Sequence, residues 1–74
     1  MENRLKKVMS EVLGIDETLI NDETSQDSID KWDSLKHMNL VVALEEEFEI
    51  EFEDEDIENL LNYKLIKITI EEKL

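Results

Sequence analysis

Residues 34–48 carry the pattern that most restricts what this chain can fold into. At about 100° per residue, one side of the segment collects an apolar stripe, the spacing typical of an amphipathic helix packed on a core. The members of that stripe are His37, Leu40, Val41, Leu44 and Phe48. Asp33 directly precedes the segment and is a suitable N-cap, because its carboxylate can accept a hydrogen bond from a free amide of the first turn. The sequence therefore predicts a helix from Ser34 to Phe48.

The N-terminal segment predicts a second helix over residues 2–13. Its apolar residues fall at i, i+3, i+4 and i+7, and they are Leu5, Val8, Met9 and Val12. Gly14, the only glycine of the chain, follows directly. A glycine there can take the left-handed conformation that closes a helix without steric cost.

The C-terminal third predicts a loop, a short helix and a longer helix. Ile50 and Phe52 alternate with acids, but this strand-like run is too short and isolated to pair, so residues 49–53 are expected to connect helices. A short helix should run from Asp54 or Asp56 to Leu61. Residues 62–74 fit both a strand (Ile66, Ile68, Ile70) and a helix (Tyr63, Ile66, Ile70, Leu74). We predict a helix capped by Asn62, because a lone strand would leave its backbone groups unpaired.

Residues 15–32 show no sustained period and predict a long ordered loop. Its apolar residues could pin it to a core, and they are Ile15, Leu19, Ile20, Ile29 and Trp32. So long a loop in a compact domain is unusual and suggests a function. The expected fold is all-α, a small four-helix bundle with a long ordered first loop and a short third helix, forming a single domain over residues 1–74.

Size and composition favour a binding role over catalysis. A chain of 74 residues buries a smaller fraction of its surface than a typical enzyme domain. It has no cysteine, one histidine and no glycine-rich loop to hold a phosphate. His37 lies on the core stripe, where a partly buried, hydrogen-bonded histidine is expected. The acidic run 51–56 lacks the glycine that an EF-hand turn requires, so no metal site is predicted.

The charge of the chain predicts the kind of partner it binds. Its formal net charge is −13, and residues 33–61 hold eleven Asp or Glu against the single Lys36. This charge opposes binding to nucleic acid or anionic lipid and favours partners with basic patches. No apolar stretch is long enough to span a bilayer, and the N-terminus has no uninterrupted apolar run. We therefore expect a cytoplasmic monomer without membrane insertion.

The predicted helix 34–48 has a second apolar side, nearly opposite the core stripe. It is formed by Leu35, Met38 and Val42 together with Asn39, Glu45 and Glu46. This side could be a docking surface for basic partners, or the loop 15–32 could fold over it. Acids near a helix C-terminus oppose the helix macrodipole, so the run Glu45 to Glu47 is interpreted as serving binding rather than helix stability.

Ser34 is the first residue of the predicted helix and directly precedes Leu35 of the second apolar side. At a helix N-terminus the free amides and the partial positive charge would stabilise a phosphate ester on its hydroxyl. Alone, the tripeptide Asp33-Ser34-Leu35 is a weak signal. Together with the run from Leu40 to Phe48, with Ile50 and Phe52, and with the acidic turn that follows, it closely resembles the acyl carrier proteins.

The resemblance implies a four-helix bundle that carries 4′-phosphopantetheine and is not itself an enzyme. In that family a phosphopantetheinyl transferase joins the cofactor from coenzyme A to the serine of Asp-Ser-Leu through a phosphodiester. Ser34 would then hold the arm, and Asp33 would help the transferase and its metal engage. The cofactor supplies the thiol that this cysteine-free chain lacks. Leu35, Met38, Val42, Glu45 and Glu46 match positions of the family's partner-recognition helix.

Some residues depart from the common family pattern and leave the pathway open. Lys31 stands where glycine is frequent, Trp32 precedes the motif, and Asn39 replaces a frequent acid. Partners would be acyl-loading and acyl-transfer enzymes of fatty acid biosynthesis or of a specialised acyl, polyketide or polysaccharide-linked pathway. Aminoacyl carriage ranks lower because no Gly-Gly precedes the motif. The alternative is an acidic interaction module without a prosthetic group, such as an inhibitor or nucleic acid mimic, which explains the acids but not Asp33-Ser34-Leu35.

Overall fold

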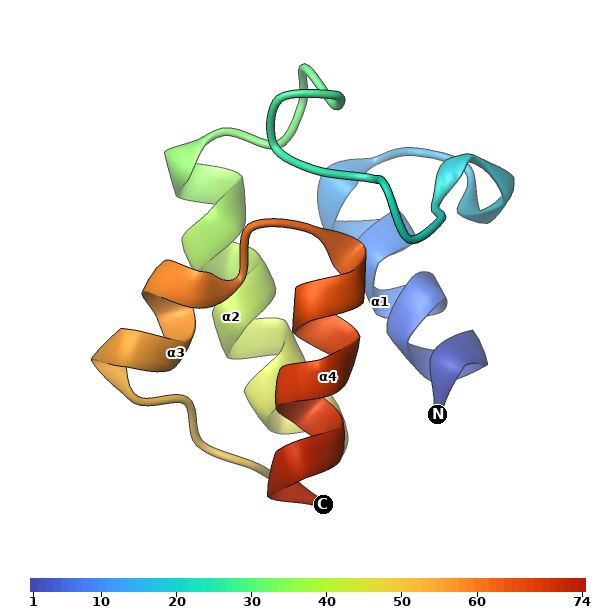
Figure 1. The fold of residues 1–74 in the computed structure, drawn as a ribbon. Helices are drawn as coiled ribbons and strands as arrows, with labels where there is room; N and C mark the ends of the chain where they lie inside the picture. The colour runs from blue at the N-terminus through green and yellow to red at the C-terminus, as the bar shows by residue number, and fades with distance from the viewer.

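The computed structural model describes residues 1–74 and contains four α-helices, one 3₁₀ turn and no strand. The elements are α1 (Glu2–Leu13), η1 (Glu17–Leu19), α2 (Ser34–Phe48), α3 (Asp54–Asn59) and α4 (Tyr63–Lys73). The helices surround a single interior, and the connection between η1 and α2 passes over one end of the bundle (Figure 1). The predicted all-α bundle with a long first loop and a short third helix is confirmed.

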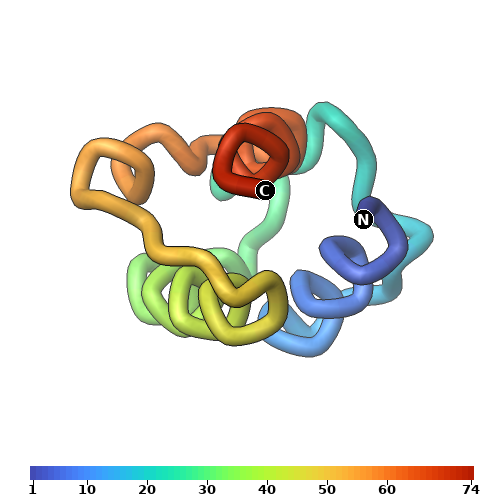
Figure 2. The backbone as a smooth tube through the Cα atoms, turned by 90° about the horizontal axis from the view of Figure 1, so that it is seen from below, coloured from blue at the N-terminus to red at the C-terminus, as the bar shows by residue number.

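The core is built from the apolar stripes of the helices. A cluster of fifteen buried residues fills it, with Leu5 and Met9 from α1, Leu40 and Leu44 from α2, and Ile66 from α4 all fully buried. Viewed along the bundle, α1, α2 and α4 surround the interior, with α3 beside α2 and α4 (Figure 2). The predicted core stripe of α2 is confirmed, because all four of its apolar members are buried.

The helix ends follow the predicted capping chemistry, with two differences. Gly14 closes α1 at φ 68°, and the side chain of Asn62 accepts a hydrogen bond from the Leu65 amide at 2.8 Å to begin α4. The sequence did not predict that α2 ends on a left-handed residue that is not glycine, Glu49 at φ 55°. Helix α3 ends at Asn59, not at Leu61, because the next residue, Leu60, leaves the helical conformation and is fully buried in the core.

Residues 15–32 are pinned to the bundle, although not by every predicted anchor. Ile20 and Trp32 are buried, whereas Leu19 is 58% exposed, so its predicted role as an anchor was wrong. A polar anchor that the sequence analysis missed is Thr24, which is buried. Its backbone carbonyl accepts a hydrogen bond from the Tyr63 amide at 2.8 Å. The loop is thereby joined to the beginning of α4.

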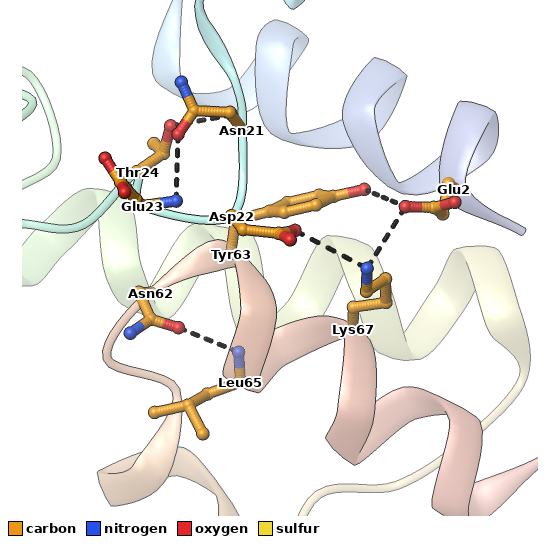
Figure 3. Close-up of polar contacts among 9 residues, drawn as sticks. All are labelled: Glu2, Asn21, Asp22, Glu23, Thr24, Asn62, Tyr63, Leu65 and Lys67. Atoms are coloured by element: carbon orange, nitrogen blue, oxygen red, sulfur yellow. Dashed lines mark hydrogen bonds and ion pairs between the residues drawn. The ribbon is translucent and has the colours of Figure 1, made fainter.

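A polar network joins α1, the loop and α4 around the Tyr63 ring (Figure 3). The Lys67 ammonium lies 3.2 Å from a carboxylate oxygen of Glu2 and 3.5 Å from one of Asp22. Burial raises the pKa of the Tyr63 hydroxyl, and the nearby Glu2 carboxylate raises it further. The Lys67 ammonium donates to Glu2, and this hydrogen bond raises its own pKa. These contacts fix the side of the bundle formed by α1 and α4.

Two further ion pairs join helices at other places. The Arg4 guanidinium lies 2.8 Å from a carboxylate oxygen of Glu47 and 4.8 Å from the centre of the Phe48 ring, which links α1 to the end of α2. The Lys73 ammonium lies 2.8 Å from a carboxylate oxygen of Asp56, which links α4 to α3. The hydrogen bond from Lys73 lowers the pKa of Asp56. None of the helices combines the length and apolar character needed to cross a membrane.

Candidate functional site

Ser34 is the first residue of α2, and it is exposed. Asp33 caps the helix as predicted, with its carboxylate accepting a hydrogen bond from the Lys36 amide at 2.8 Å. The first amides of a helix have no carbonyl partner within it, and they carry the positive end of the macrodipole. A phosphate ester on the Ser34 hydroxyl would therefore lie in solvent beside this positive end. The residues present fit a phosphate-linked group.

The second side of α2 is open, beginning one residue after Ser34. The exposed fractions of Leu35, Met38 and Val42 are 70%, 50% and 51%. The loop 15–32 does not cover them, so the alternative that it folds over this side was wrong. Asn39 and Glu46 are exposed as well. We call this surface, formed by Leu35, Met38, Asn39, Val42, Glu45 and Glu46, the α2 face.

Two of the three acids near the end of α2 have structural contacts that the sequence analysis did not foresee. A carboxylate oxygen of Glu45 accepts a hydrogen bond from the Phe52 amide at 2.8 Å, which fixes the connection to α3. Glu47 binds Arg4 through its carboxylate and also through its backbone carbonyl. The interpretation of this run as serving binding alone was therefore incomplete. Glu46 is the member whose carboxylate is exposed and has none of these contacts.

Trp32 and His37 bracket the attachment motif and contact each other. The Trp32 indole N–H donates to His37 Nδ1 at 3.1 Å, and His37 Nε2 lies 3.3 Å from the backbone carbonyl of Ile57 in α3. Trp32 is buried and His37 is partly buried, so the prediction of a satisfied structural histidine is confirmed. The sequence did not predict this contact. Its only sign in the sequence is that two aromatic residues lie five positions apart.

Lys31 also has a structural role at its position beside the motif. Its ammonium donates to the backbone carbonyl of Gly14 at 3.1 Å. That carbonyl lies just past the end of α1, where the macrodipole favours a cation. Lys31 and Trp32, which depart from the common family pattern, thus both hold the end of the loop in place ahead of Ser34.

The site is a surface and not a cavity. Four hollows occur on the molecule, and none of them is lined by Ser34 or by a residue of the α2 face. No group of three or more His, Asp or Glu side chains is arranged to hold a metal ion. The arrangement offers one exposed hydroxyl and an adjacent apolar and acidic surface, which suits attachment and docking.

Comparison with known proteins agrees with this geometry. A family described as the phosphopantetheine attachment site matches residues 3–64. The solution NMR structure of a holo acyl carrier protein from Geobacter metallireducens is similar, with a TM-score of 0.87 and 34% sequence identity over 96% of this chain and 82% of that one. The chain belongs to the acyl carrier protein family.

Membership in the acyl carrier protein family defines what kind of protein this is. It is a carrier and not an enzyme, and its prosthetic group is covalently attached 4′-phosphopantetheine. The matched segment includes the N-terminus of α2 and the whole α2 face. The long loop before the site is held to the end of α1 by the hydrogen bond from Lys31 to Gly14, and to the beginning of α4 by the one from the Tyr63 amide to Thr24.

Proposed function

We propose that this protein carries acyl groups on a 4′-phosphopantetheine arm joined to Ser34 by a phosphodiester, and that it delivers them to enzymes docked on the α2 face. The observation that carries the proposal is the position of Ser34, exposed at the N-terminus of α2 within Asp33-Ser34-Leu35. When bound, the cofactor supplies the thiol that forms the acyl thioester. The chain itself positions the arm and presents the surface that partners recognise.

The flanking residues support Ser34 as the attachment point in different ways. Asp33 shapes the first turn through its bond to the Lys36 amide. Its carboxylate, next to the serine, is proposed to help the transferase and its metal engage. Leu35, 70% exposed, provides an apolar contact directly beside the serine. Ser10 donates to the Ile15 carbonyl and Ser28 to the Ser25 carbonyl, so these hydroxyls are already used inside the protein.

The α2 face supports docking by partners with basic patches around an apolar centre. Leu35, Met38 and Val42 give an apolar surface on one side of a single helix, and Glu45 and Glu46 follow one turn further on. Apolar area contributes most of the binding free energy, while complementary charge raises the association rate. The partners are a phosphopantetheinyl transferase and acyl-loading and acyl-transfer enzymes.

We also propose the kind of pathway in which the carrier acts. The carrier serves fatty acid biosynthesis or a specialised acyl, polyketide or polysaccharide-linked pathway, as a cytoplasmic monomer. Asn39 supports the specialised alternative, because it places a neutral amide between Leu35 and Val42, where many members of the family carry an acid. An enzyme that requires an acid at that point of the carrier would bind this face less well.

Intact-mass analysis after coexpression with a broad phosphopantetheinyl transferase tests the attachment site. Wild type should gain the mass of one phosphopantetheinyl group, and Ser34→Ala should gain none. Ser25→Ala is the matched control, because it removes a hydroxyl from the loop and leaves the Asp33-Ser34-Leu35 turn unchanged. Absence of the gain in wild type, or an equal gain in Ser34→Ala, would contradict the proposal.

A further inference from the structure

A hydrogen bond joins the side chains of Trp32 and His37, at the two ends of the segment that contains Ser34. The Trp32 indole N–H donates to His37 Nδ1 at 3.1 Å, and the planes of the two rings differ by 23°, so the rings lie edge to edge. The bridge therefore spans Asp33 and Ser34, and it holds the turn in which the serine lies. His37 Nε2, 3.3 Å from the Ile57 carbonyl, connects this turn to α3.

The chemistry of the two rings determines where the imidazole proton lies. An indole N–H is a donor only, so His37 Nδ1 has to be the acceptor. The proton of the neutral imidazole is then on Nε2, where it can be donated to the carbonyl of Ile57. Both bonds are satisfied by this one tautomer. A protonated imidazole would place an N–H at Nδ1, directly opposite the indole N–H, and the buried indole would lose its acceptor.

We propose that Trp32 and His37 form a proton-sensitive latch on the Ser34 turn, closed while His37 is neutral and released when His37 is protonated. Histidine is the side chain whose charge ordinarily changes between about pH 5 and 8. Release would leave the buried indole without its acceptor and loosen the turn that presents Ser34, without unfolding the bundle. His37 thus acts as a positioning residue, through Trp32, for the attachment site. This consequence for arm transfer depends on the proposed function of Ser34.

His37 forms no ion pair. No carboxylate oxygen lies within 4.0 Å of either ring nitrogen. The charged residues on the elements packed against it are Asp30, Lys31 and Asp33 before α2, Lys36 in α2, and Asp56 and Glu58 on either side of Ile57. Of these, Lys31 is bound to the Gly14 carbonyl, Asp33 to the Lys36 amide, and Asp56 to Lys73.

Thermal unfolding and fluorescence test the latch in the apo protein, where nothing depends on the arm. Between about pH 8 and pH 5, the Tm of wild type should fall by about 4 °C or more relative to that of Trp32→Phe, which has no indole donor to lose. Trp32 is the only tryptophan, so its emission reports the latch directly. The emission should change over this pH range in wild type and stay constant in His37→Gln, whose side chain remains neutral. Equal Tm changes in wild type and Trp32→Phe would overturn the latch. A change of emission with pH in His37→Gln as large as that in wild type would overturn it as well.

The link to Ser34 is tested by the initial rate of arm transfer. The ratio of the wild-type rate to the His37→Gln rate, measured with one transferase at both pH values, removes the pH dependence of the enzyme itself. We expect this ratio to fall severalfold on acidification. If this ratio is the same at both pH values while the emission of wild type changes with pH, the latch does not act on the serine. Arm uptake by Ser34→Ala would instead refute the proposed function and leave the fluorescence result standing.

Discussion

At the scale of single residues, Asp33 has two roles that substitutions can separate. Its carboxylate caps α2 by accepting the Lys36 amide at 2.8 Å, and its charge stands beside the proposed attachment serine. Asparagine can accept the same hydrogen bond without the charge, whereas alanine can do neither. Asn62 provides a natural control, because it caps α4 through the Leu65 amide at the same distance, 2.8 Å, and lies outside the site.

We predict that Asp33→Ala lowers the free energy of unfolding by about 1 kcal/mol, and that Asp33→Asn lowers it by less. Both variants should slow arm transfer, because both lack the carboxylate that we propose engages the transferase and its metal. Asn62→Ala should lose similar stability while keeping the wild-type transfer rate. Denaturant unfolding and transfer kinetics on the three variants measure the two roles. A normal transfer rate in Asp33→Asn would show that Asp33 serves only as a cap.

At the scale of elements, α2 faces the core on one side and solvent on the other, and the two sides should respond differently to charge. Met38 and Val42 are about half exposed, so a glutamate at either position can remain in water. Leu61, 55% exposed between α3 and α4, offers a matched apolar position outside the α2 face. Glu45 is a poor probe of docking charge, because it also holds the Phe52 amide.

We predict that Met38→Glu and Val42→Glu weaken partner turnover severalfold and leave the helical circular dichroism signal unchanged. The reason is that each places a charge in the apolar centre of the proposed docking surface, where a partner would have to desolvate it. Leu61→Glu should change neither property. Turnover by a partner enzyme and far-ultraviolet circular dichroism provide the two measurements. Loss of helical signal in Met38→Glu or Val42→Glu would mean that these side chains support the fold.

At the scale of the whole molecule, local patterns predicted the elements and long-range contacts determined how they are joined. The sequence alone was enough to predict the extent of α2, its cap at Asp33 and its two sides. These features depend on residues only a few positions apart in the chain. The Arg4 to Glu47 pair and the Lys31 to Gly14 bond join residues far apart in the chain, and these partners are chosen only once the helices are packed. The same holds for Leu60, whose burial ends α3 early.

The charge of the whole molecule predicts opposite effects of salt on folding and on docking. The chain has 21 acids and a net charge of −13, and its ion pairs engage only Glu2, Asp22, Glu47 and Asp56. The longest extent of the molecule is 26 Å. At about 0.01 M salt the screening length is about 30 Å, so all the acids repel one another, whereas at about 1 M it is about 3 Å. These ion pairs are exposed or partly exposed at the surface, where ion pairs contribute little to stability, so they offset little of this repulsion.

We therefore expect Tm to rise by several degrees between these two salt concentrations, while the KM for a transferase with a basic patch rises as well, because salt screens the attraction between the two proteins. Glu51→Gln should raise Tm at low salt and reduce the salt dependence, since Glu51 is exposed and belongs to none of the ion pairs. Thermal melts and transfer kinetics along one salt series measure both effects. A Tm that falls with salt would show that the ion pairs between helices outweigh the repulsion among the acids.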